Sequence, residues 1–144
     1  MTALLQGTGQ PPVRPLFWHF PHYTNQGGKP AGAIRDGDWK LVEQYEDGSV
    51  ELYNLARDFG ETTNLANQQP ERAAELRSKL RDWRQRVGAQ TNTANLSFDA
   101  ILHRGLYEAF DASRFDPAKA NAAEWKRADD WRRQMDAVVP KGKP

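Results

Sequence analysis

The chain contains no cysteine among its 144 residues. A disulfide framework, a thiolate zinc site, an iron–sulfur cluster and a cysteine nucleophile are therefore all excluded. Other nucleophile signals are absent as well, because none of the four serines lies in a G-x-S-x-G elbow. The sequence also lacks the G-x-G-x-x-G and P-loop patterns of nucleotide-binding proteins.

A surplus of charge of one sign is missing too, because 20 Lys and Arg residues balance 19 Asp and Glu residues. This balance does not indicate a nucleic-acid or membrane-surface partner. No run approaches the roughly 18 apolar residues of a membrane span, and residues 1–10 lack the features of a signal peptide. We therefore expect no nucleic-acid partner, no membrane partner and no targeting segment, and the cellular compartment stays open.

Hydrophobic residues are scarce, at 38% of the chain, and the mean hydropathy is -0.85. Aromatic residues nevertheless make up 10% of the sequence and include five tryptophans, which argues against general disorder. The length suits one compact domain. We expect a folded chain with a thin core.

The first third of the chain alternates short apolar runs with Gly and Pro. Residues 1–15 carry enough of these breakers to exclude a helix and predict an extended segment. Residues 16–20 (LFWHF) form a short aromatic run closed by Pro21, which favours a strand. A loop rich in Gly and Pro follows, then a brief strand at 33–35, a turn at Asp36-Gly37 and a longer strand over 38–46.

Asp47-Gly48 lies between two alternating runs and predicts a β-hairpin with a two-residue turn. That turn would place Tyr45 opposite Val50 and Glu43 opposite Leu52. The predicted shared face consists of Trp39, Leu41, Tyr45, Val50 and Leu52, interrupted by Glu43. Farther on, Asp58 and Glu61 have the D-x-x-E spacing of a capping box, which predicts a helical turn there.

Apolar residues recur every three or four positions between 70 and 87, which predicts an amphipathic helix with Pro70 at its start and Gly88 beyond its end. Its predicted buried stripe is Ala73, Leu76, Leu80, Trp83 and Val87. Six basic residues on this helix could suggest a polyanion site. Interleaved acidic residues, paired four apart as Glu75–Lys79 and Asp82–Arg86, favour a solvated face instead.

Residues 89–97 are rich in Thr, Asn and Ala and are typical of a linker. A short helix is predicted within 98–110. Asp116-Pro117 then predicts the start of a long helix that ends before Pro140. Its predicted buried stripe is Trp125, Ala128, Trp131, Met135 and Val138. On this helix Asp129 and Asp130 point about 100° apart, so they are interpreted as surface residues.

His19 and His22 are three residues apart, so that two imidazoles could meet one ligand or metal. A catalytic metal needs a third ligand, and no nearby carboxylate has a recognisable spacing. We therefore predict no metal site and no catalytic residue in this chain. The alternative to a shared ligand is that both histidines are structural: His19 packs beside an aromatic strand, and His22 is an exposed loop residue.

Four stretches together resemble the C-terminal subdomain of bacterial sulfatases of the arylsulfatase type, which belong to the alkaline-phosphatase-like superfamily. They are residues 15–23 (PLFWHFPHY), 32–41 (GAIRDGDWKL), 51–55 (ELYNL) and 58–66 (DFGETTNLA). Residues 4–7 (LLQG) are similar to the segment that precedes this subdomain, so the resemblance covers about residues 3–88. Residues 106–107, 111–117, 125 and 131–132 resemble the C-terminal tails of some members less specifically.

The resemblance implies a catalytic domain N-terminal to this region, with a parallel sheet, a bound calcium or magnesium and a formylglycine made from Cys or Ser. No serine in this chain lies in the modification motif. Nucleophile, metal ligands and leaving-group acid are therefore not expected here, and the chain alone should not hydrolyse sulfate esters. The expected partner is a sulfatase catalytic domain, in the same chain or in a separate one.

In the complete family enzyme this subdomain packs beside the catalytic domain and lends residues to the rim of the substrate pocket. The resemblance implies a substrate-binding role for His19 and His22, toward a sulfated saccharide. We expect an α+β fold with a small antiparallel sheet, a covering helix and a helical tail, divided into a subdomain (1–88) and a linker with tail (89–144). The alternative function is a free-standing saccharide-binding or protein-interaction module.

Overall fold

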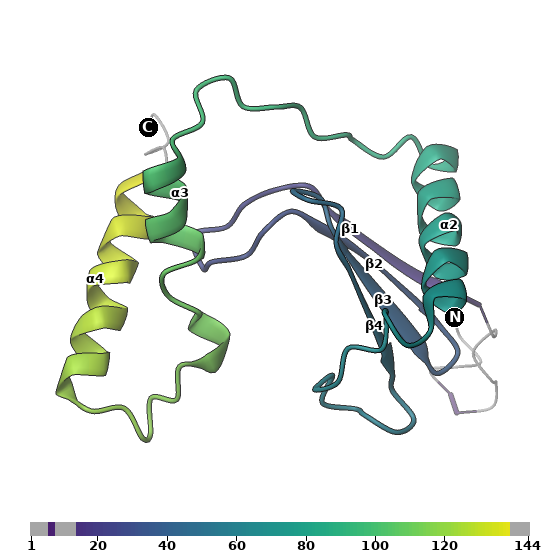
Figure 1. Cartoon of the computed structure of the whole chain (residues 1–144), viewed down its shortest axis with the longest axis horizontal. Helices are drawn as coiled ribbons and strands as arrows, with labels where there is room; N and C mark the ends of the chain where they lie inside the picture. The colour runs from purple at the N-terminus through teal and green to yellow at the C-terminus, as the bar shows by residue number, and fades with distance from the viewer. Residues whose placement is uncertain (1–5, 8–13, 139–144) are drawn as a thin grey trace. The chain divides into compact units, whose positions relative to one another are not determined.

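The computed structural model describes residues 6–7 and 14–138. The predicted extended segment at 1–15 and the chain end after 138 lie largely outside these residues. The elements, in chain order, are β1 (Leu16–Phe20), β2 (Ala31–Asp36), β3 (Trp39–Gln44), β4 (Val50–Asn54), α2 (Pro70–Arg86), α3 (Ala100–Tyr107), the 3₁₀ helix η1 (Ala112–Arg114) and α4 (Ala122–Val138) (Figure 1). This arrangement confirms the predicted α+β fold.

The chain divides into two compact units. The first comprises Met1–Phe20 and Ala31–Gln90, and it contains the four strands and α2. The second comprises Pro21–Pro30 and Thr91–Pro144, and it contains α3, η1 and α4. The loop between β1 and β2 therefore belongs with the C-terminal helices, which the sequence did not indicate. Within the described residues, no helix is long and apolar enough to span a bilayer.

The sheet of the first unit is antiparallel throughout, in the order β1-β2-β3-β4. Its tight hairpin joins β2 to β3, where Asp36 pairs with Trp39 across a two-residue turn. Gly37, the first central residue of that turn, has a φ of 60°, as a type II′ turn requires.

The β3–β4 hairpin occurs at the predicted place, but its predicted register is wrong. Glu43 pairs with Val50 and Leu41 pairs with Leu52. The loop has four residues rather than two, because Gln44 N–H donates to the Ser49 carbonyl at 2.9 Å and closes it. Longer hairpin loops of this kind are commonly built around a type I turn. Tyr45 consequently leaves the strand and lies in the loop.

Helix α2 covers one face of the sheet (Figure 1). Its side chains Ala73, Leu76 and Leu80 are buried, as predicted, and the core that they complete adds Ile34, Leu41 and Leu52. Two of the predicted stripe residues differ. Val87 is 53% exposed because the helix ends at Arg86. Trp83 is only partly buried, and it stacks on Phe17 of β1 at 4.9 Å.

The predicted turn after Asp58 is present at residues 59–60, but it is not helical and has no capping box, so that part of the prediction is wrong. The Asp58 carboxylate accepts the backbone N–H groups of Thr62 and Thr63, which lie in non-helical chain. These hydrogen bonds hold the pKa of Asp58 below its usual value. Glu61 instead reaches Lys40, whose Nζ donates to both of its carboxylate oxygens at 2.6 and 2.7 Å.

In the second unit, α3 and α4 pack around Leu106, Trp131 and Met135. Helix α4 begins at Ala122 rather than at Asp116-Pro117, because the Asn121 side chain accepts the N–H groups of Ala123 and Glu124. Asp116 caps an isolated turn instead. The predicted stripe is right for Trp131 and Met135 and wrong for Trp125 and Val138, which are exposed.

Candidate functional site

His19 lies on β1, opposite Gly32, and faces the side of the sheet that α2 covers. Both of its ring nitrogens have partners within the first unit. Nε2 lies 2.8 Å from the Gln90 carbonyl oxygen, which can only accept, so Nε2 carries the proton. Nδ1 lies 2.7 Å from the Tyr45 hydroxyl oxygen, and this hydroxyl donates to Nδ1 when the imidazole is neutral. His19 thus ties the edge strand to the chain segment that follows α2.

The Tyr45 ring fits over Gly32 because glycine has no side chain there. A Cβ at position 32 would come within 2.2 Å of the Tyr45 hydroxyl oxygen. The Arg84 guanidinium lies 4.8 Å from the centre of the Tyr45 ring, in cation–π geometry. Burial raises the pKa of Tyr45 above its usual value, so this hydroxyl keeps its proton at neutral pH.

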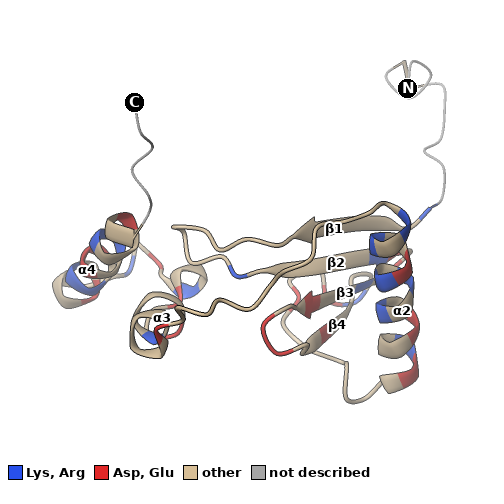
Figure 2. Cartoon of the chain, turned by 90° about the horizontal axis from the view of Figure 1, so that it is seen from above, with Lys and Arg blue, Asp and Glu red and all other residues tan. Residues whose placement is uncertain are grey.

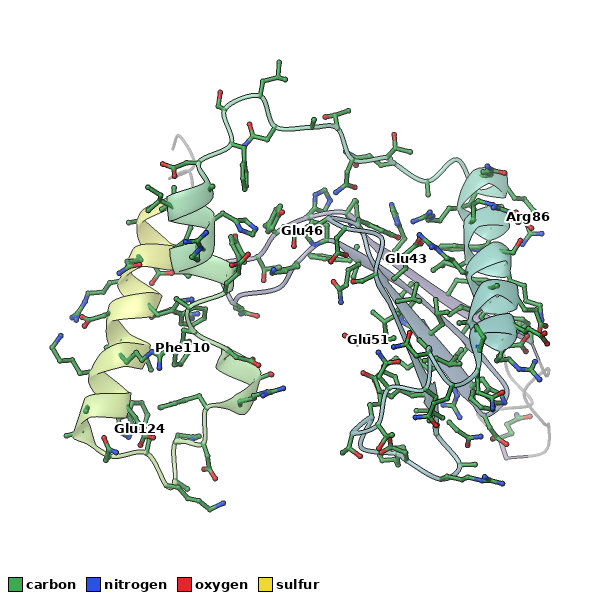
Figure 3. The ribbon with its side chains drawn as sticks, viewed as in Figure 1. Glu43, Glu46, Glu51, Arg86, Phe110 and Glu124 are labelled. Atoms are coloured by element: carbon green, nitrogen blue, oxygen red, sulfur yellow. The ribbon has the colours of Figure 1, made fainter. Side chains whose placement is uncertain are left out.

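Glu43 is the buried charge of this cluster, with 8% of its side chain exposed. Its carboxylate lies between the sheet and α2 (Figure 3), where Oε1 accepts Arg77 Nε at 2.8 Å and Oε2 lies 3.3 Å from Arg84 Nη1. We name these five residues the His19–Glu43 cluster: His19, Glu43, Tyr45, Arg77 and Arg84. Its polar groups bind mainly one another, and this favours a role in fixing the helix to the sheet.

His22, the second predicted site residue, is exposed and belongs to the loop of the second unit. The structure therefore holds the two predicted histidines in different units. In the described part of the chain, no group of three or more His, Cys, Asp or Glu side chains is arranged to hold a metal ion.

Sequence reasoning missed Tyr45 and Arg84, although both contribute to the cluster around His19. Tyr45 was assigned to a strand, and Arg84 was assigned to a solvated helix face. The available signal was Gly32 itself, since a glycine inside a strand often marks the close approach of another residue.

The face of the sheet opposite α2 is only partly covered. On its β1 side, Leu16, Trp18 and Phe20 are 38%, 50% and 45% exposed. This strand carries no Lys, Arg, Asp or Glu (Figure 2), and Trp18 and Phe20 lie opposite the small residues Ala33 and Ala31, whereas Leu16 lies opposite Arg35. On the β4 side, the Lys40–Glu61 ion pair and the buried Tyr53 lie under the loop before α2. We call Leu16, Trp18 and Phe20 the open β1 face.

No protein-family model matches the sequence. A protein named Sulfatase from Formosa agariphila is 45% identical to it over 78 residues, which cover 47% of this chain and 14% of that protein. The chain thus contains a region related to a sulfatase, and it spans only a small part of that relative's length.

Proposed function

We propose that this chain is the C-terminal portion of a sulfatase, and that it packs against a catalytic domain that these residues do not contain. The observation that carries the proposal is the 45% identity over 78 residues to a protein of which they represent 14%. The four motif stretches of the sequence, in the order of the family subdomain, support the C-terminal assignment.

In this proposal the chemistry of sulfate-ester hydrolysis resides outside the chain. A metal in the catalytic domain would polarise the sulfate, and a formylglycine there would attack the sulfur. The residues of this chain would stabilise the arrangement around that site. The interlocked His19–Glu43 cluster, which fixes α2 to the sheet, supports such a scaffolding role.

The open β1 face is the proposed contact with the catalytic domain. Exposed apolar side chains gathered on one uncharged strand are typical of a surface that another protein covers. The opposite half of the same sheet face is covered by the chain's own loop, so the β1 half is where a partner would add burial.

A substrate-pocket rim role for His19 and His22 belongs to the same proposal. His22 is exposed, which suits an imidazole that would hydrogen-bond a sugar hydroxyl. For His19, the two hydrogen bonds to Tyr45 and Gln90 support the structural alternative.

Complementation tests the proposal directly. The Formosa agariphila sulfatase, with its 78 matched residues deleted, would be produced together with this chain, and copurification and hydrolysis of an aryl sulfate would be measured. We expect copurification with the unaltered chain and with Val87→Glu, which adds a charge at an exposed site on the helix end. Trp18→Glu places the same charge on the open β1 face and should abolish it.

Two results would overturn the proposal. One is a chain that remains a monomer without affinity for the deleted sulfatase, which would favour the free-standing module. The other is equal binding by Trp18→Glu and Val87→Glu, which would remove the open β1 face from the interface. A reading frame upstream of Met1 that encodes the formylglycine motif would support the proposal independently.

A further inference from the structure

Four aromatic rings of the second unit gather around one pocket. His103 of α3 is the centre of this group: its ring centroid lies 5.3 Å from Phe98, 5.4 Å from Tyr107 and 5.9 Å from Tyr23. Tyr23 comes from the loop between β1 and β2, and its ring contacts that of Tyr107 at 4.8 Å. The rings line a pocket of about 260 Å³. We call it the Tyr23–His103 pocket.

These rings are not sealed within the core. Phe98 is 57% exposed and Tyr23 is 44% exposed, whereas the core of this unit consists of Leu106, Trp131 and Met135. A half-exposed aromatic ring can still bury its remaining face, together with the apolar surface of a ligand, away from water. The pocket therefore offers an apolar wall of rings that are tilted against one another and that the folded unit leaves accessible.

Polar groups form the rest of the pocket lining. Asn95, Ser97 and Asp99 come from the segment that leads into α3. Asn95 Oδ1 accepts the Ser97 N–H, and Asp99 Oδ1 accepts the N–H groups of Ile101 and Leu102. These bonds orient an amide and a carboxylate at fixed positions beside the rings. No Lys or Arg occurs among the residues that line the pocket.

We propose that the Tyr23–His103 pocket binds an uncharged sugar residue. A pyranose is amphipathic in the same way, because its C–H face packs on aromatic rings while its hydroxyls need donors and acceptors at the edge. Asp99 carries the only carboxylate in the lining and repels an anion, and the lining contains no Lys or Arg that would pair with a sulfate group. The pocket thus suits an unsulfated residue of a saccharide.

This inference does not require that the chain complete a sulfatase, so it can be tested on the chain alone. The probes are the methyl glycosides of glucose, galactose, rhamnose and xylose, and galactose 6-sulfate. Saturation-transfer NMR detects weak binding, and the ring signals of His103 and the tyrosines report its location. Binding of at least one neutral glycoside, with shifts at these rings, is expected.

Two variants and one matched control locate the site. Phe98→Ala and Tyr23→Ala each remove one half-exposed ring and should weaken binding about tenfold, as truncation of an aromatic anchor does. Phe59→Ala removes an 87% exposed ring of the first unit and should leave binding unchanged. Unshifted methyl signals of Met135 would show that the second unit of each variant is folded.

The proposal is overturned if no neutral glycoside binds at millimolar concentration, which would make the rings a packing cluster only. It is also overturned if galactose 6-sulfate binds more tightly than the neutral sugars, or if both ring variants of the pocket bind as well as Phe59→Ala. Preferential binding of tetramethylammonium would contradict it as well, since that result would assign the pocket to cations.

Discussion

Replacing Arg84 by methionine should destabilise the first unit more than replacing Glu43 by methionine, although the two side chains form one ion pair. The reason is their unequal burial: the side chain of Glu43 is 8% exposed, and that of Arg84 is 25% exposed. Loss of Arg84 leaves a buried carboxylate with Arg77 as its remaining cation. Loss of Glu43 leaves two guanidinium groups that can turn toward water.

The expected magnitudes follow from this asymmetry. Breaking a buried ion pair from one side costs about 3 to 5 kcal/mol, and Arg77 retains part of that energy, so we expect about 3 kcal/mol for Arg84→Met. A buried charge replaced by an apolar side chain of similar size is often neutral, so Glu43→Met should cost about 1 kcal/mol or less. The difference of about 2 kcal/mol is well above the error of such measurements.

Urea unfolding, followed by tryptophan fluorescence, measures the unfolding free energy of both variants. The comparison is valid if the slope of this free energy against urea concentration is the same for both. Arg81→Met is the matched control. Arg81 lies on the same helix, its side chain is 59% exposed, and its hydrogen bonds run to Ser78 and Asp82. Its cost should stay within about 0.5 kcal/mol. If Glu43→Met proves more destabilising than Arg84→Met, burial of the carboxylate does not govern this cluster.

Three further predictions concern the core, the pH dependence and the chemistry. Trp83→Ala should cost about 2 kcal/mol, less than for a fully buried tryptophan because Trp83 is only partly covered by Phe17; an unchanged urea midpoint would contradict the stacking. Burial, reinforced by Glu51, raises the pKa of Tyr53 to about 12, so its stabilisation is complete below about pH 10 and lost as the pH rises toward 12. Thermal melts across this range should fall less for Tyr53→Phe. The purified chain, incubated with an aryl sulfate and calcium, should release no sulfate. If sulfate is released and a substitution in this chain abolishes the release, the proposal that catalysis resides outside the chain is refuted.

Local patterns predicted the strands and α2 because the signals for those elements lie within a few residues of each other. The pairing of the β3–β4 hairpin was wrong because Asp47-Gly48 is compatible with loops of several lengths. The chosen length depends on Tyr45, whose ring packs over Gly32 and under Arg84, which are distant in sequence. Likewise, the partners of His19 lie 26 and 71 residues away, at Tyr45 and Gln90, and no spacing rule connects them.

The start of α4 shows the same limit at short range. Asp116-Pro117 and Asn121 with Glu124 are both good helix-start signals, and both are used, the first for one isolated turn and the second for the helix. The long helix begins at the second signal, where the side chains of Asn121 and Glu124 each accept the backbone N–H of the other residue.

The loop between β1 and β2 makes the second unit discontinuous in sequence, and this limits how the gene can be shortened or rearranged. Within that unit, Arg132 Nη1 donates to the Asn25 carbonyl, Asn92 Nδ2 donates to the Pro21 carbonyl, and Trp131 lies against Gly27. A protease cut between Gln90 and Thr91 would therefore leave two fragments that still share one folded unit. For the same reason, a stop codon after Gln90 would remove α3 and α4. It would leave Pro21–Pro30, ten residues of the second unit, between β1 and β2 without the rest of that unit.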